Sequence, residues 1–139
     1  MTTCLIVQPI AEVGLNLLRQ AGLTLNVATD RSLPAMKPFL AEAIAVVTRD
    51  AGFSAEAIAV APHLRVIGVH GTGTNAVAVD VAKARGISVV NTPGANAQSV
   101  AELAIGLMLA CARRLIEADR AVRADDFAWR YRQHSFELQ

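Results

Sequence analysis

The stretch that decides the fold is Val66–Ala76, "VIGVHGTGTNA", in which an apolar run leads into a glycine-containing segment. The apolar run predicts a buried strand, and the glycines predict a turn into a helical segment at 76–86. A second apolar run at 87–92 predicts the next strand. This order is typical of a parallel sheet, because parallel neighbours need a crossover connection between them.

The same alternation extends back to the N-terminus. Apolar runs predict five strands, at 4–9, 23–28, 43–49, 64–70 and 87–92. Helical patterns lie between them, at 11–22, 37–43, 55–61 and 76–86. In the first helix Val13, Leu17 and Leu18 form the apolar stripe, and Ser54 is the expected N-cap of the third. The sequence therefore predicts an α/β fold with a doubly wound, five-stranded parallel sheet.

After Pro93 the pattern changes. Ser99 is predicted to cap a long helix that runs to about Arg113, with Glu102 at the third position of its capping box. The residues from 127 to 139 show no clear period, so we expect the helix to be followed by an extended C-terminal tail.

Composition narrows the class of protein. The chain has 139 residues, enough for one domain with its own core, and is 53% hydrophobic but only 4% aromatic. A net charge of +1 provides no basic field for nucleic acid, so we expect no such partner. No stretch is long and apolar enough to span a membrane, and Cys4 and Cys111 in apolar runs indicate buried thiols. We expect a cytoplasmic protein without a metal site.

The segment from Gly71 to Ala76 has three interpretations. Gly-x-Gly-x-x-Ala after a strand is a loose form of the dinucleotide fingerprint, but the carboxylate expected at the end of the next strand is replaced by Asn91. The glycines could instead provide only the backbone freedom of a tight turn. Thirdly, a turn at this sheet edge could bind a small carboxylate through backbone N–H groups, aided by Arg49 from the preceding strand.

The segment 64–114 carries a longer pattern, in which the glycine turn is followed by Asn91-Thr92-Pro93 and by Asn96-Ala97-Gln98-Ser99-Val100-Ala101-Glu102. In this combination the chain resembles the D-isomer-specific 2-hydroxyacid dehydrogenases, the family of phosphoglycerate dehydrogenase and hydroxypyruvate reductase. The resemblance implies a flavodoxin-like substrate domain at 1–95. It also implies that 96–139 form an interdomain helix and tail leading to a Rossmann domain for NAD(H) or NADP(H).

The resemblance also implies the site. Its substrate, a small 2-oxo or 2-hydroxy acid, would contact Arg49, Asn96 and the turn residues Val69, His70, Gly71, Thr72 and Gly73. The family's catalytic residues and cofactor site would lie beyond Gln139. We therefore expect the chain to be a truncated, N-terminal portion with no catalytic residue, no cofactor and no activity of its own. Apolar residues spread all around the helix that starts near Ser99, and such a helix needs cover on every side, so we expect a homo-oligomer, a dimer, formed through it.

A second hypothesis stays open beside this one. The chain could be a stand-alone, non-enzymatic flavodoxin-like module that binds a small carboxylate or a protein partner.

Overall fold

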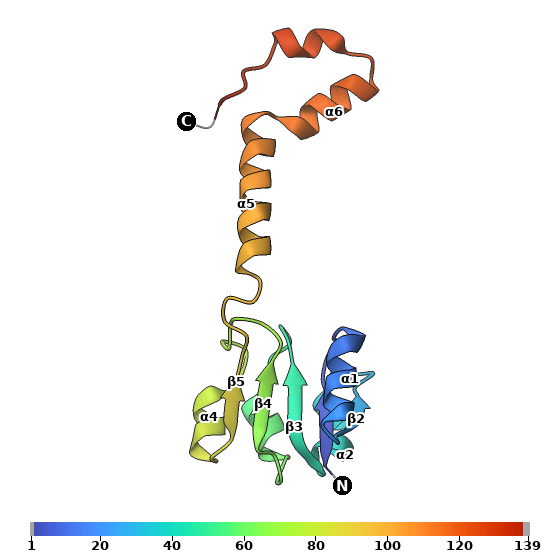
Figure 1. The fold of residues 1–139 in the computed structure, drawn as a ribbon, viewed down its shortest axis with the longest axis vertical. Coiled ribbons are helices and arrows are strands. Elements are labelled where there is room, and N and C mark those ends of the chain that lie inside the picture. Colours follow the sequence, from blue (N-terminus) through green and yellow to red (C-terminus); the bar gives the residue numbers. More distant parts are fainter. Residues whose placement is uncertain (1, 138–139) are drawn as a thin grey trace. The chain divides into compact units, whose positions relative to one another are not determined.

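The computed structural model describes residues 2–137, which fall into two compact units, 2–95 and 96–137. The first unit is built on a five-stranded parallel sheet in the order β2-β1-β3-β4-β5 (Figure 1). The strands are β1 (Thr3–Ile6), β2 (Thr24–Val27), β3 (Ala43–Thr48), β4 (Val66–Val69) and β5 (Ser88–Val90). The helices between them are α1 (Glu12–Gln20), α2 (Leu33–Leu40), α3 (Ala55–Ala59) and α4 (Val79–Ala84).

This strand order confirms the predicted doubly wound sheet, because 2-1-3-4-5 is the flavodoxin-like arrangement. The chain leaves β1 toward β2 on one side and later returns on the other side to form β3. The point between β1 and β3 is therefore the topological switch point, where such sheets bind ligands at the carboxyl ends of their strands.

Each face of the sheet has its own apolar cluster. The larger one contains Leu5, Leu40 and Ile58, which are all fully buried, together with residues of α4. The smaller one gathers Cys4 and Ile6 of β1 with residues of α1. Since both faces of β1 are covered, all four of its residues are buried, as expected for a central parallel strand.

The inner side of α1 differs from the predicted stripe. Leu15 and Leu18 pack into the smaller cluster, whereas Val13 and Leu17 are 69% and 62% exposed. The prediction was wrong for two of its three residues. The helix is short, and its few apolar side chains permit more than one stripe, so its contact with β1 and β2 decides which side faces inward.

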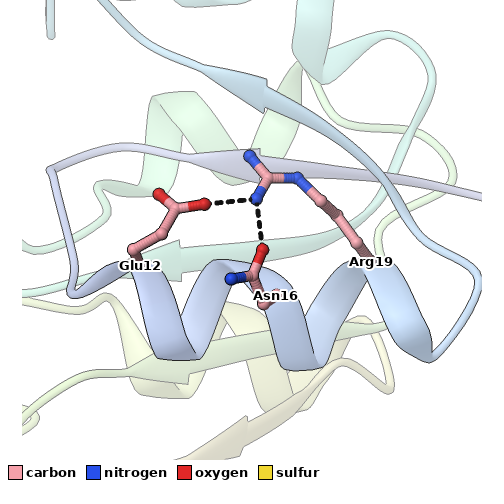
Figure 2. A network of polar contacts seen from close by, with 3 residues as sticks. All are labelled: Glu12, Asn16 and Arg19. Carbon is pink, nitrogen blue, oxygen red and sulfur yellow. Dashed lines mark hydrogen bonds and ion pairs between the residues drawn. The ribbon is translucent and has the colours of Figure 1, made fainter.

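The exposed side of α1 carries a small polar network (Figure 2). Arg19 Nη1 donates to Glu12 Oε1 at 2.6 Å and to Asn16 Oδ1 at 2.8 Å. The ion pair is open to solvent at both ends, so it contributes little to stability. Burial of the inner side of α1 has the larger effect.

Two helix starts also differ from the prediction. Helix α2 begins at Leu33, before the predicted 37–43, because Pro34 fits the first turn of a helix, where an N–H has no partner to lose. The long helix α5 (Ala97–Ala112) has Asn96 as its N-cap residue, so Ser99 is not the cap. In place of the predicted capping box, Gln98 Nε2 donates to Glu102 Oε1 at 2.7 Å.

The predicted Ser54 cap of α3 is confirmed, with the hydroxyl accepting from Ala57 N–H at 3.2 Å.

The second unit consists of α5, α6 (Leu115–Arg123) and the short 3-10 helix η1 (Phe127–Tyr131). Helix η1 occupies part of the segment 127–139, for which we predicted an extended tail, and α6 lies in the charged stretch before that segment. Arg114 lies between α5 and α6 in the left-handed region, with φ 51°, and the chain changes direction there (Figure 1). Farther on, Phe136 N–H donates to Ala112 O at 2.9 Å, which ties the end of the unit back to α5.

The two cysteines have different environments. Cys4 is fully buried in β1, as predicted, but Cys111 on α5 is exposed, so the prediction of a second buried thiol was wrong.

Across residues 2–137, no helix is both long and apolar enough to cross a membrane.

We expect Cys4 to make the fold sensitive to alkali. Burial raises the pKa of this thiol from 9.0 to about 11, so the folded chain keeps the proton that the unfolded chain loses. This difference in pKa contributes roughly 2 kcal/mol to the free energy of unfolding. The contribution is fully present below pH 9 and is lost as the pH rises toward 11. Urea unfolding of wild type and Cys4→Val across this range checks the expectation. Parallel pH profiles for the two proteins would contradict it.

Candidate functional site

The carboxyl ends of β3 and β4 form a pocket of about 350 Å³. Its lining residues are Arg49, Asp50, Val69, His70, Gly71 and Gly73, and we call it the Arg49 pocket. It brings together five of the seven residues predicted for substrate binding. Thr72 lies in the same turn without lining the pocket, and Asn96 belongs to the second unit.

The glycine turn is tied to both neighbouring strands. His70 N–H donates to Thr48 O at 2.8 Å, and Gly71 N–H donates to Val69 O at 2.8 Å. On the other side, Asn91 Nδ2 donates to Thr72 O at 2.6 Å. The N–H groups of His70 and Gly71 therefore already have acceptors within the protein, one in β3 and one in the turn's own strand.

The backbone N–H of Gly73 differs from those of His70 and Gly71. Within the described residues, the Gly73 N–H has no hydrogen-bond acceptor. Gly73 lines the pocket, so an oxygen of an anion bound there is a candidate acceptor for this N–H.

The two glycines are not required by the backbone of the turn. Neither Gly71 nor Gly73 has a positive φ, and a Cβ at either position would meet no atom within 4 Å. The interpretation of these glycines as a source of backbone freedom is therefore wrong. Both glycines line the pocket, and the lack of side chains leaves open space at these two positions.

Two residues that follow β1, Gln8 and Pro9, hold the Arg49 side chain and its loop in place. Arg49 Nη1 donates to Pro9 O at 3.1 Å, which occupies one of the five N–H donors of the guanidinium. The backbone N–H groups of Arg49 and Ala51 both donate to Gln8 Oε1, at 3.1 and 2.9 Å. The other end of the same amide, Gln8 Nε2, donates to Asp50 Oδ1 at 2.8 Å.

Sequence analysis missed both Gln8 and Asp50. The available signal was a polar residue directly before Pro9, at the end of a strand whose other residues are apolar. Gln8 is 8% exposed, and a buried amide needs partners, so its position at the sheet edge indicated a network there.

The Asp50 carboxyl group is held in its charged form. The hydrogen bond from Gln8 is the main cause that lowers its pKa below the ordinary value, and the bond from its own backbone and the charges of Arg49 and Arg31 act in the same direction. The Arg49 pocket thus presents one cation and one anion.

The turn from Gly71 to Ala76 does not fit a dinucleotide. In such sites a helix begins directly at the glycines and points its N-terminus at the pyrophosphate, and a carboxylate follows at the end of the next strand. Here α4 begins only at Val79 and has six residues. Asn91 stands where the carboxylate would be, and its amide is bound to Thr72 O. Nor do residues 2–137 contain a group of three or more potential metal ligands.

Fold and site together define a class: an open parallel α/β domain with a small, anion-compatible pocket at the carboxyl edge of its sheet. A family model described as "D-isomer specific 2-hydroxyacid dehydrogenase, catalytic domain" matches residues 4–134. The chain therefore belongs to the D-isomer specific 2-hydroxyacid dehydrogenase family, in agreement with the resemblance seen in the sequence.

Individual relatives agree with this assignment. D-3-phosphoglycerate dehydrogenase of Archaeoglobus fulgidus is 39% identical over 86% of this chain and 23% of its own length. Hydroxypyruvate reductase of Thermotoga maritima is 51% identical over 47% of this chain and 21% of its own length. The structure of 2-hydroxyacid dehydrogenase from Ketogulonicigenium vulgare superposes with a TM-score of 0.75 and 31% identity, over 100% of this chain and 44% of that one. The chain thus spans about a quarter of the length of these two curated relatives and less than half of the solved structure.

Proposed function

We propose that this chain provides the substrate-binding portion of an NAD(P)-dependent D-2-hydroxyacid dehydrogenase. The observation that carries the proposal is the combination, in one pocket, of an unused Gly73 N–H, the Arg49 guanidinium and open space at both glycines. A carboxylate matches these three features, because its two oxygens accept from backbone and guanidinium donors at once.

In this proposal the chain's own residues bind and orient a 2-oxo or 2-hydroxy acid. The Arg49 guanidinium retains donors beside its bond to Pro9 and can form a charge-assisted contact with one carboxylate oxygen. Gly73 N–H can donate to the other oxygen, and Val69 provides an apolar wall. Among family members the nicotinamide supplies the hydride, and we assign no step of that transfer to residues 2–137.

The two units have separate roles in the proposal. Residues 1–95 form the substrate domain, and α5 begins the connection toward a cofactor domain. We also propose that α5 forms the contact of a homodimer, since its apolar side chains lie all around the helix and remain exposed.

Gly73→Val tests the carboxylate site. The substitution causes no backbone strain, because φ is not positive and no atom lies near its Cβ, so we expect unfolding stability within about 1 kcal/mol of wild type. The two added methyl groups would enter the mouth of the pocket and abolish binding of glyoxylate. Amide shifts of the ¹⁵N-labelled chain during a glyoxylate titration provide the measurement, with the Gly71 signal as the reporter that both proteins share.

Asn75→Val is the matched control, since it adds a branched side chain to an exposed position of the same loop that does not line the pocket. It should bind glyoxylate as wild type does. Unchanged binding by a folded Gly73→Val chain would show that the carboxylate is held elsewhere.

A further inference from the structure

We propose that Asp50, fixed by Gln8, makes the Arg49 pocket select acids with a single negative charge over acids that carry a second anionic group such as a phosphate. This inference rests on the proposed function, because it concerns the substrate class of the same pocket. It identifies a specificity-determining carboxylate, Asp50, which is not needed to bind the first carboxylate, and a positioning amide, Gln8.

The geometry begins with Gln8. Its amide is buried at the end of β1 and uses both ends: Oε1 accepts from two N–H groups of the loop after β3, and Nε2 donates to Asp50 Oδ1 at 2.8 Å. An amide oriented by two N–H donors cannot rotate without losing them. The Asp50 carboxylate is therefore held at the pocket wall, while an unrestrained surface aspartate would turn away from an approaching anion.

The charge balance follows from this arrangement. Arg49 is the only lysine or arginine that lines the Arg49 pocket among the described residues, and a bound carboxylate would take up its charge. A second anionic group on the same ligand would then meet the Asp50 carboxylate. Arg31 also acts electrostatically on Asp50, but it lines a different hollow, beside Leu33 and Met36 of α2.

Coulomb repulsion between two partly exposed negative charges sets the size of the penalty in binding affinity. Like charges about 6 Å apart, in surroundings between water and protein surface, change a binding constant by about tenfold. Burial of the ligand's other groups does not alter this difference between two ligands that share the same carbon skeleton.

The names of the relatives include one enzyme for an acid with a phosphate and one for an acid with a single negative charge. One is a dehydrogenase of 3-phosphoglycerate, which carries a phosphate as well as a carboxylate, and another is a reductase of hydroxypyruvate, which has one carboxylate and a hydroxyl. Asp50 places this chain with the second kind. Its carboxylate oxygen that is not bonded to Gln8 can accept from a hydroxyl but repels a phosphate.

The test compares D-glycerate with D-3-phosphoglycerate, which differ only by the phosphoryl group. Each is titrated at pH 8, where the phosphate is a dianion, into the ¹⁵N-labelled full chain, with the Gly73 amide as the reporter. We expect D-glycerate to bind wild type about tenfold more tightly than D-3-phosphoglycerate. Asp50→Asn should reduce this ratio to about threefold or less while D-glycerate binding is retained.

Two further variants separate a role in specificity from a general effect of charge or folding. Asp30→Asn removes an exposed carboxylate that is bonded to Ser32 and does not line the pocket, so the ratio should stay at its wild-type value. Gln8→Ala frees Asp50 without removing its charge, and the ratio should fall between those of wild type and Asp50→Asn. Equal binding of both acids by wild type, or an unchanged ratio in Asp50→Asn, would overturn the inference alone. If neither acid shifted the Gly73 amide, the carboxylate site itself would fail and the inference with it.

Discussion

Gly52→Ala is expected to destabilise the first unit by roughly 3 kcal/mol. Gly52 has φ +70°, and a Cβ there would lie 2.0 Å from Ala76 O, a backbone atom that cannot move independently. That carbonyl accepts from Phe53 N–H at 3.0 Å, in the bridge that joins the loop after β3 to the segment before α4. The added methyl group would push these two segments apart and break the bond between them.

The same substitution should also weaken the Arg49 pocket. Gly52 O accepts from the buried Thr48 hydroxyl at 2.7 Å, so a shift of Gly52 disturbs the loop that carries Arg49 and Asp50. Urea unfolding gives the change in stability, and the glyoxylate titration gives the change in binding.

Gly22→Ala is the matched control for this experiment. Gly22 has φ +82°, but no atom lies within 4 Å of its ideal Cβ, so only the backbone cost of about 1 kcal/mol applies. The difference between the two variants measures the lack of space at Gly52. Equal destabilisation would show that the loop can relax around the methyl group.

Charged residues on α5 should abolish the proposed dimer. The side chains of Val100, Leu103, Ile105, Leu107, Met108 and Leu109 are between 44% and 63% exposed. Each would contribute about 1.5–3 kcal/mol if buried, which is a substantial driving force for association. In a symmetric dimer a double substitution, Leu103→Glu with Leu107→Glu, removes four such contacts and places four carboxylates at the contact. We expect the dissociation constant to rise by about a thousandfold or more.

Sedimentation equilibrium over micromolar concentrations checks this expectation. Val122→Glu on α6 is the control, since it replaces another exposed apolar residue of the same unit without touching α5, and it should remain dimeric. A wild-type chain that sediments as a monomer throughout this range would refute the proposed dimer.

Local patterns explain why much of the fold could be predicted. The runs that became β3 and β4 are apolar over nearly their whole length, which suits strands covered on both faces. The Ser54 cap depends only on a bond to a residue three positions away, so it too was visible in the sequence. The family pattern at 91–102 was likewise contained in neighbouring residues.

The site depended on contacts that no local pattern contains. Gln8 reaches the loop after β3 across 41 to 43 positions of the chain, and only the pairing of β1 with β3 brings them together. The glycines of the turn could be located in the sequence, but whether they provide backbone freedom or open space depends on their φ values and on the atoms around them. The sequence by itself therefore determined the parallel sheet and the family, and it predicted the edge of the sheet at which a ligand would bind. Only the tertiary structure decided which groups meet there, because residues far apart in the chain become neighbours only when the strands pair.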